Sequence, residues 1–123
     1  GERTEEGLRL LAEALETVQK TEERWYEAGL YRLKGELLLK SGNSQTLEAE
    51  ACFQQAIEIA QKQEAKSWEL RAATSLARLW QQQGKKDEAR ELLSPVYDWF
   101  TEGFDTADLK DAKALLDQLS EGQ

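Results

Sequence analysis

Two short series of side chains with more basic than acidic groups are the part of this sequence best suited to binding chemistry. Guanidinium and ammonium groups hold carboxylates through charge-assisted hydrogen bonds, which an arginine can make in pairs. The series run through Arg32, Glu36, Leu39 and Lys40, and through Arg71, Thr74, Arg78 and Gln81. Their positive balance is the reverse of that of the whole chain, whose net charge is −8. They predict a site for an acidic peptide or for the carboxylate at a peptide C-terminus.

An ordinary solvated helix surface is the alternative interpretation of these two series. Glu36 and Lys40 have the i, i+4 spacing of a surface ion pair on a helix. Such pairs are common, and each stabilises a helix by only a few tenths of a kcal/mol. The spacing of the charges by itself leaves both interpretations open.

The sequence lacks the residue combinations that catalysis requires. It has no histidine, no glycine-rich phosphate loop after a strand, and no serine or cysteine beside an activating base. Cys52 is the only cysteine, and we expect it to be a small, partly buried filler rather than a modification site. Asp105, Asp108 and Asp111 lack the spacing of a calcium loop, and the start of a helix explains them better. We therefore expect no enzyme activity, no cofactor and no metal.

The composition limits the remaining classes of function. The excess of 24 acidic over 16 basic residues disfavours nucleic acid as a partner. The sequence contains neither an apolar run long enough to cross a membrane nor a secretion leader, which predicts a cytoplasmic protein without membrane contact. It begins with Gly1 instead of methionine, so we interpret it as a piece of a longer protein.

A repeated alternation of small and large residues predicts the architecture. The pattern small-x-x-x-large-x-x-small recurs at intervals of 42 and 40 residues, and its i, i+4, i+7 spacing places each set on one helical face. A second pattern lies between these sets and recurs after 42 residues. The first pattern comprises Gly7, Leu11 and Ala14, then Ala49, Phe53 and Ala56, then Ala89, Leu93 and Val96; the second comprises Tyr31, Gly35 and Leu38, then Ala73, Ala77 and Trp80.

These patterns predict an all-α domain of antiparallel helix-turn-helix repeats with about six helices, in which bulky side chains seat against small residues of the next helix. Gly42 and Gly84 are expected to end two of the helices. The domain would span residues 1–123, with a helix at 5–22, repeats at 23–63 and 66–101, and a capping helix at 105–120. Asp105 or Thr106 is the expected N-cap of the last helix, whose Asp108 and Asp111 would face water.

With these residues in place, the sequence resembles the tetratricopeptide repeat family over about residues 5 to 101. Tyr31, Gly35, Leu38, Ala49, Phe53 and Ala56 match one repeat of that family, and the corresponding residues from Ala73 to Val96 match the next. Lys34 stands where the family has leucine, and the period of 40 to 42 exceeds the family's 34. The resemblance implies a protein-binding groove lined by Arg32, Glu36, Lys40, Arg71, Thr74 and Arg78.

A narrower resemblance covers residues 65–119. This segment is similar to the C-terminal region of large bacterial regulators that join a cyclase-type or DNA-binding domain to a signal-transducing ATPase core and a repeat arm. It implies a regulatory context, and it supplies no catalytic residue of those domains.

Three functions follow as hypotheses. The first is a protein-protein interaction module with a regulatory role. The second is a structural cap or a homodimerisation segment, because the first helix would expose Leu8, Leu11, Leu15 and Val18 without a preceding helix. The third is an arm that senses a small-molecule inducer.

The four tryptophans are expected to serve packing. By its alignment, Trp80 belongs to the core. Trp25, Trp68 and Trp99 lie near predicted helix ends and would wedge between neighbouring helices.

Overall fold

The fold is all-helical. The computed structural model describes residues 2–21, 26–42 and 45–121, and within those ranges it contains six α-helices and no strand. The helices are α1 (Glu2–Thr21), α2 (Glu27–Ser41), α3 (Thr46–Lys62), α4 (Lys66–Gln82), α5 (Lys86–Asp98) and α6 (Ala107–Ser120). This confirms the predicted fold class, an all-α helical repeat with about six helices.

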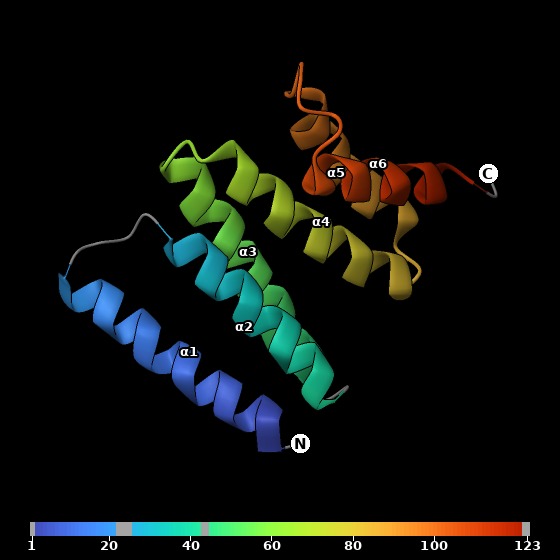
Figure 1. The fold of residues 1–123 in the computed structure, drawn as a ribbon. Helices are drawn as coiled ribbons and strands as arrows, with labels where there is room; N and C mark the ends of the chain where they lie inside the picture. The colour runs from blue at the N-terminus through green and yellow to red at the C-terminus, as the bar shows by residue number, and fades with distance from the viewer. Residues whose placement is uncertain (1, 22–25, 43–44, 122–123) are drawn as a thin grey trace.

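The helices follow one another as a chain of packed neighbours (Figure 1). Each helix contacts the next, and α4 also contacts α2 and α6. The even-numbered helices therefore form a row with α4 at its centre. Side chains on this row come from segments about 40 residues apart, and the row positions the groove described below.

Several small residues of the repeated patterns lie where helices pack closely together. A Cβ atom on Gly35 of α2 would lie 2.5 Å from the ring of Phe53 on α3, so only glycine fits there. One repeat later, Ala77, Ala89 and Leu93 are fully buried in the same core cluster. The predicted exchange of small and large residues across each turn is confirmed at these positions.

The turns after α3 and α4 have the same hydrogen-bond geometry. Ala65 N–H donates to Ala60 O, and Lys85 N–H donates to Trp80 O, each over 2.8 Å. Both turns need one residue with positive φ, as helix C-terminal caps commonly do. That residue is Gly84 (φ 81°) in the second turn but Glu64 (φ 55°) in the first. The predicted glycine cap is confirmed at Gly84, and Gly42 after α2 also has positive φ (138°).

Helix α6 packs against α4 and α5 and extends their core. Its N-cap is Thr106, whose hydroxyl accepts a hydrogen bond from Leu109 N–H, which confirms one of the two predicted caps. Leu109, Ala112, Leu115 and Leu119 are buried in the cluster that also contains Ala77 and Leu93. The apolar face of α6 is thus buried in the core.

The predicted exposure of an apolar stripe on the first helix is wrong. Leu11 and Leu15 are each only 7% exposed, and Leu8 packs against the cluster around Phe53. The reason is that α2 lies along this face of α1 and covers it. The side chain of Val18 lies outside the described residues.

The tryptophans divide into packed and exposed rings. Trp68 packs between helices as predicted, with its ring against Gly29 of α2. Trp80 is partly buried beside both main core clusters, and its indole N–H donates to Glu50 Oε1 over 2.9 Å. The prediction for Trp99 is wrong, because this residue is 57% exposed at the end of α5. Trp25 lies outside the described residues.

Within the described ranges, no helix combines the length and the apolar character needed to cross a membrane.

Candidate partner-binding groove

A cavity of about 230 Å³ lies along the row of even-numbered helices. Helix α2 contributes one residue, α4 four residues and α6 two. They are Arg32 from α2, then Arg71, Thr74, Ser75 and Arg78 from α4, and Asp108 and Asp111 from α6. Three helices distant in sequence thus supply one polar groove.

The spacing along α4 explains why that helix lines the groove. Arg71, Thr74, Ser75 and Arg78 stand at i, i+3, i+4 and i+7, so they share one face of the helix. Thr74 and Ser75 are buried, and the Thr74 hydroxyl donates to Leu70 O over 2.7 Å. The Thr74 oxygen keeps acceptor capacity, and the two arginines lie a turn to either side of it.

Arg71 is fixed by contacts on two sides. Its Nε–H donates to Asp108 Oδ2 over 2.7 Å, which joins α4 to α6. Its guanidinium carbon also lies 4.9 Å from the centroid of the Trp68 ring, within the range of a cation–π contact. The guanidinium is therefore held in one orientation at the edge of the groove.

Arg32 and Arg78 enter no ion pair among the described residues. The Nε atom of Arg32 is buried and has no hydrogen-bond partner. A buried donor without a partner is uncommon and costs free energy, since its hydration is lost without replacement. Arg32 and Arg78 therefore keep donors available to an anionic group.

The structure brings together four of the six residues that the resemblance implied. Arg32, Arg71, Thr74 and Arg78 line the cavity, whereas Glu36 and Lys40 on α2 are not among its lining residues. Both lie further towards the C-terminus of α2 than Arg32.

Sequence reasoning missed the contribution of α6. Asp108 and Asp111 were expected to face water, and Asp111 is indeed exposed, but both also line the cavity, and the half-buried Asp108 is bonded to Arg71. The available signal was their i, i+3 spacing next to the stripe of Leu109 and Ala112, which seats α6 on α4. The groove therefore carries three guanidinium groups and two carboxylates, and it is less basic than predicted.

Cys52 plays no part in this groove. It is buried beside Phe53 in the core, as predicted for a small filler. Burial raises the pKa of its thiol, with Lys34 opposing and Glu48 reinforcing the shift. Among the described residues, no group of histidine, cysteine or acidic side chains is arranged to hold a metal ion.

No family model matches the chain, and no curated protein or solved structure matches it either.

Proposed function

We propose that this chain is a non-catalytic protein-interaction module whose groove binds an acidic segment of a partner. The observation that carries the proposal is the cavity shared by Arg32, Arg71 and Arg78, in which Arg32 and Arg78 enter no ion pair among the described residues. A carboxylate entering the groove would pair with these guanidinium groups. It would be held by charge-assisted hydrogen bonds from arginines on two helices.

Asp108 supports this proposal, because it is a carboxylate already bound by the groove. Its Oδ2 accepts from Arg71 over 2.7 Å, in the manner expected for an incoming acidic side chain. With Arg71 engaged, an acidic partner would bind first to Arg32 and Arg78, and it would compete with Asp108 for Arg71. The groove would thus select partners with more than one carboxylate.

The resemblance of residues 65–119 to C-terminal repeat arms supports a regulatory role within a larger bacterial signalling protein. Regulation would depend only on the free energy with which the partner binds, without any chemical step in this chain. A partner that binds one state of an attached domain more tightly than another shifts the population of those states.

Fluorescence anisotropy with a labelled acidic peptide tests the groove. The probe is a nonapeptide with three glutamates and a free C-terminal carboxylate, and its twin carries glutamines and a C-terminal amide. The variant Arg71→Glu/Arg78→Glu should abolish binding of the acidic probe. The control Lys62→Glu/Lys85→Glu makes the same change in net charge at exposed residues outside the cavity, and it should bind nearly as the unmodified protein does. Equal affinity of the Arg71→Glu/Arg78→Glu variant and the unmodified protein would refute the proposal.

Self-association through the first two helices is a second candidate. Leu10 on α1 and Leu33 on α2 are exposed, although the stripe around Leu11 is not. Large exposed apolar side chains at one end of a helical repeat can bind a further copy. Light scattering should then report a dimer that the double change Leu10→Glu/Leu33→Glu converts to a monomer, and a monomeric unmodified chain would exclude this candidate.

A further inference from the structure

A second and larger cavity lies at the start of α4. Its volume is about 730 Å³, and it is formed by the end of α3, the turn before α4, the first turn of α4, and the aromatic residues Trp99 and Phe100 that follow α5. Acidic and aromatic side chains dominate its lining. Glu64 and Glu69 are the acidic residues, and Trp99 and Phe100 are the aromatic ones.

This cavity already binds a cation of the chain itself. Lys66 Nζ lies 5.4 Å from the centroid of the Trp99 ring and 3.4 Å from Glu69 Oε1. Glu69 is only 5% exposed, and Gln61 Nε2 donates to its second oxygen over 3.2 Å. An aromatic face next to a fixed carboxylate is the combination that recognises ammonium and guanidinium groups. Lys66 demonstrates that the geometry suits a positive charge.

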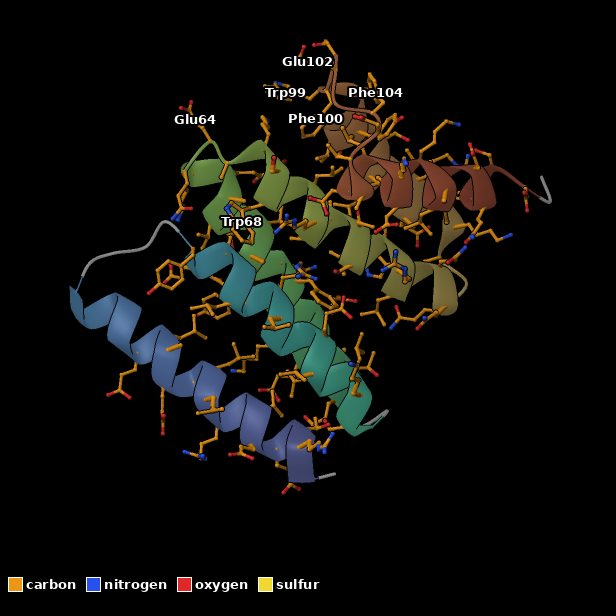
Figure 2. The ribbon with its side chains drawn as sticks, viewed as in Figure 1. Glu64, Trp68, Trp99, Phe100, Glu102 and Phe104 are labelled. Atoms are coloured by element: carbon orange, nitrogen blue, oxygen red, sulfur yellow. The ribbon has the colours of Figure 1, made fainter. Side chains whose placement is uncertain are left out.

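Lys66 uses only part of the available surface. Trp99 remains mostly exposed with Lys66 beside it, and Phe104 in the following loop is exposed as well. Glu64 and Glu102 are exposed and enter no ion pair in the described part of the chain. Figure 2 shows Glu64, Trp99, Phe100, Glu102 and Phe104 at the same end of the molecule, around the α3–α4 turn and the segment after α5. These exposed aromatic rings and unpaired carboxylates could contact a second cation in addition to Lys66.

The backbone at Glu64 strengthens the case for a function at this cavity. Glu64 has φ 55°, while the equivalent position of the next turn is Gly84. A residue with a Cβ is strained there, and strained backbone residues cluster at functional sites. The first turn thus keeps a carboxylate on the rim of the cavity at a position that favours glycine.

We propose that the cavity bordered by Glu64, Glu69, Trp99 and Phe100 is a docking site for a basic peptide of a partner protein. An arginine or lysine side chain would lie over the exposed face of Trp99, with its charge facing the carboxylate of Glu64. Apolar side chains of the same peptide would cover Phe100 and Phe104. Charge complementarity decides the class of partner, because the lining is acidic and the whole chain carries −8. This site and the arginine groove differ in residues and in charge, so neither depends on the other.

A pair of matched peptides provides the primary test. The probe is a fluorescein-labelled nonapeptide with two arginines and two leucines, and its twin has citrulline, which is neutral and of the same shape, in place of both arginines. The arginine peptide should bind at least about five-fold more tightly than the citrulline peptide, measured by fluorescence anisotropy. Equal affinities for the two peptides would overturn the proposal.

Three substitutions locate the binding at the cavity. Trp99→Leu should weaken binding of the arginine peptide about three-fold while Trp99→Phe retains most of it, since only an aromatic ring attracts the cation. Lys66→Gln should tighten binding, because it frees the ring face and removes a like charge. Unchanged affinity in Trp99→Leu, or unchanged or weaker affinity in Lys66→Gln, would overturn the shared cation site.

The excess negative charge of the chain attracts any basic peptide, and a charge-matched pair of variants separates this effect. Glu64→Gln should weaken binding about two-fold, whereas Glu88→Gln, an exposed change at the start of α5, should leave it unchanged. Equal losses in the two variants would show non-specific attraction and overturn the site. All of these side chains except that of Lys66 are exposed, so circular dichroism and thermal melting should confirm native folding in each variant.

Discussion

Arg71 donates through Nε–H to Asp108 Oδ2 over 2.7 Å, and this bond is an ion pair between α4 and α6 across the candidate groove. The two side chains are 42% and 33% exposed, so solvent screens the pair and its contribution to stability is small. Its importance lies in binding, because Asp108 occupies one of the three arginines that an acidic partner would use.

Asp108→Asn should therefore separate binding from stability. Loss of the carboxylate frees Arg71, and the affinity for the acidic nonapeptide should rise about three-fold. The free energy of unfolding should fall by no more than about 0.5 kcal/mol, measured by urea denaturation. Asp98→Asn removes an equal charge at an exposed position outside the cavity and serves as the control. A weaker affinity in Asp108→Asn would mean that Asp108 helps to bind the partner.

Gly35→Ala tests the close approach of α2 to α3. The added methyl would lie 2.5 Å from the Phe53 ring, which is fully buried. We expect a loss of about 1 to 3 kcal/mol in the free energy of unfolding, although alanine is the better helix former.

Gly7→Ala is the matched control for that change. A methyl on Gly7 would meet only the end of the Leu37 side chain, at 3.1 Å, and leucine can adjust its rotamer. The higher helix propensity of alanine should then leave stability unchanged or slightly raised. If Gly35→Ala behaved like Gly7→Ala under urea denaturation, the Gly35–Phe53 contact would be looser than the structure indicates.

The helices could be predicted from sequence because their buried faces follow from the spacing of small and large residues along the chain. Small residues at i and i+7 around a large residue at i+4 determine which face of each helix is buried, as Ala49, Phe53 and Ala56 illustrate. The alignment of the repeats also placed Arg32 and Arg71 on helix faces that point into one groove.

The features that sequence reasoning missed depend on which neighbour covers a given face. Leu11 and Leu15 form an apolar stripe whether or not α2 lies over them, so periodicity could not report their burial. Asp108 looked solvated until α6 was placed against α4. Glu64 has positive φ because its turn has the same hydrogen bonds as the turn at Gly84, and no residue preference of glutamate indicates that conformation.

Glu64→Gly should stabilise the fold. Glycine removes the strain of a Cβ at φ 55°, which costs roughly 1 kcal/mol, and it removes a negative charge next to the C-terminus of α3. The gain is reduced by the extra freedom of glycine in the unfolded chain, so we expect a net increase of about 0.5 kcal/mol. Gly84→Ala in the equivalent turn should destabilise by about 1 kcal/mol. If urea denaturation shows that the free energy of unfolding rises in Glu64→Gly and falls in Gly84→Ala, both turns require a residue that favours positive φ. A loss of stability in Glu64→Gly would contradict this requirement.

Cys52 should make stability fall at alkaline pH. Burial raises the pKa of its thiol in the folded state, so the folded protein retains this proton at pH values where the unfolded chain loses it. The contribution of the thiol is complete below the pKa of the unfolded cysteine, near pH 8.5, and it is lost as pH rises towards the folded pKa. Urea denaturation between about pH 7 and pH 10 should show a steeper decline for the unmodified protein than for Cys52→Ala. Parallel declines would mean that the thiol titrates alike in both states, and rapid labelling of the native protein by a thiol reagent at neutral pH would contradict its burial.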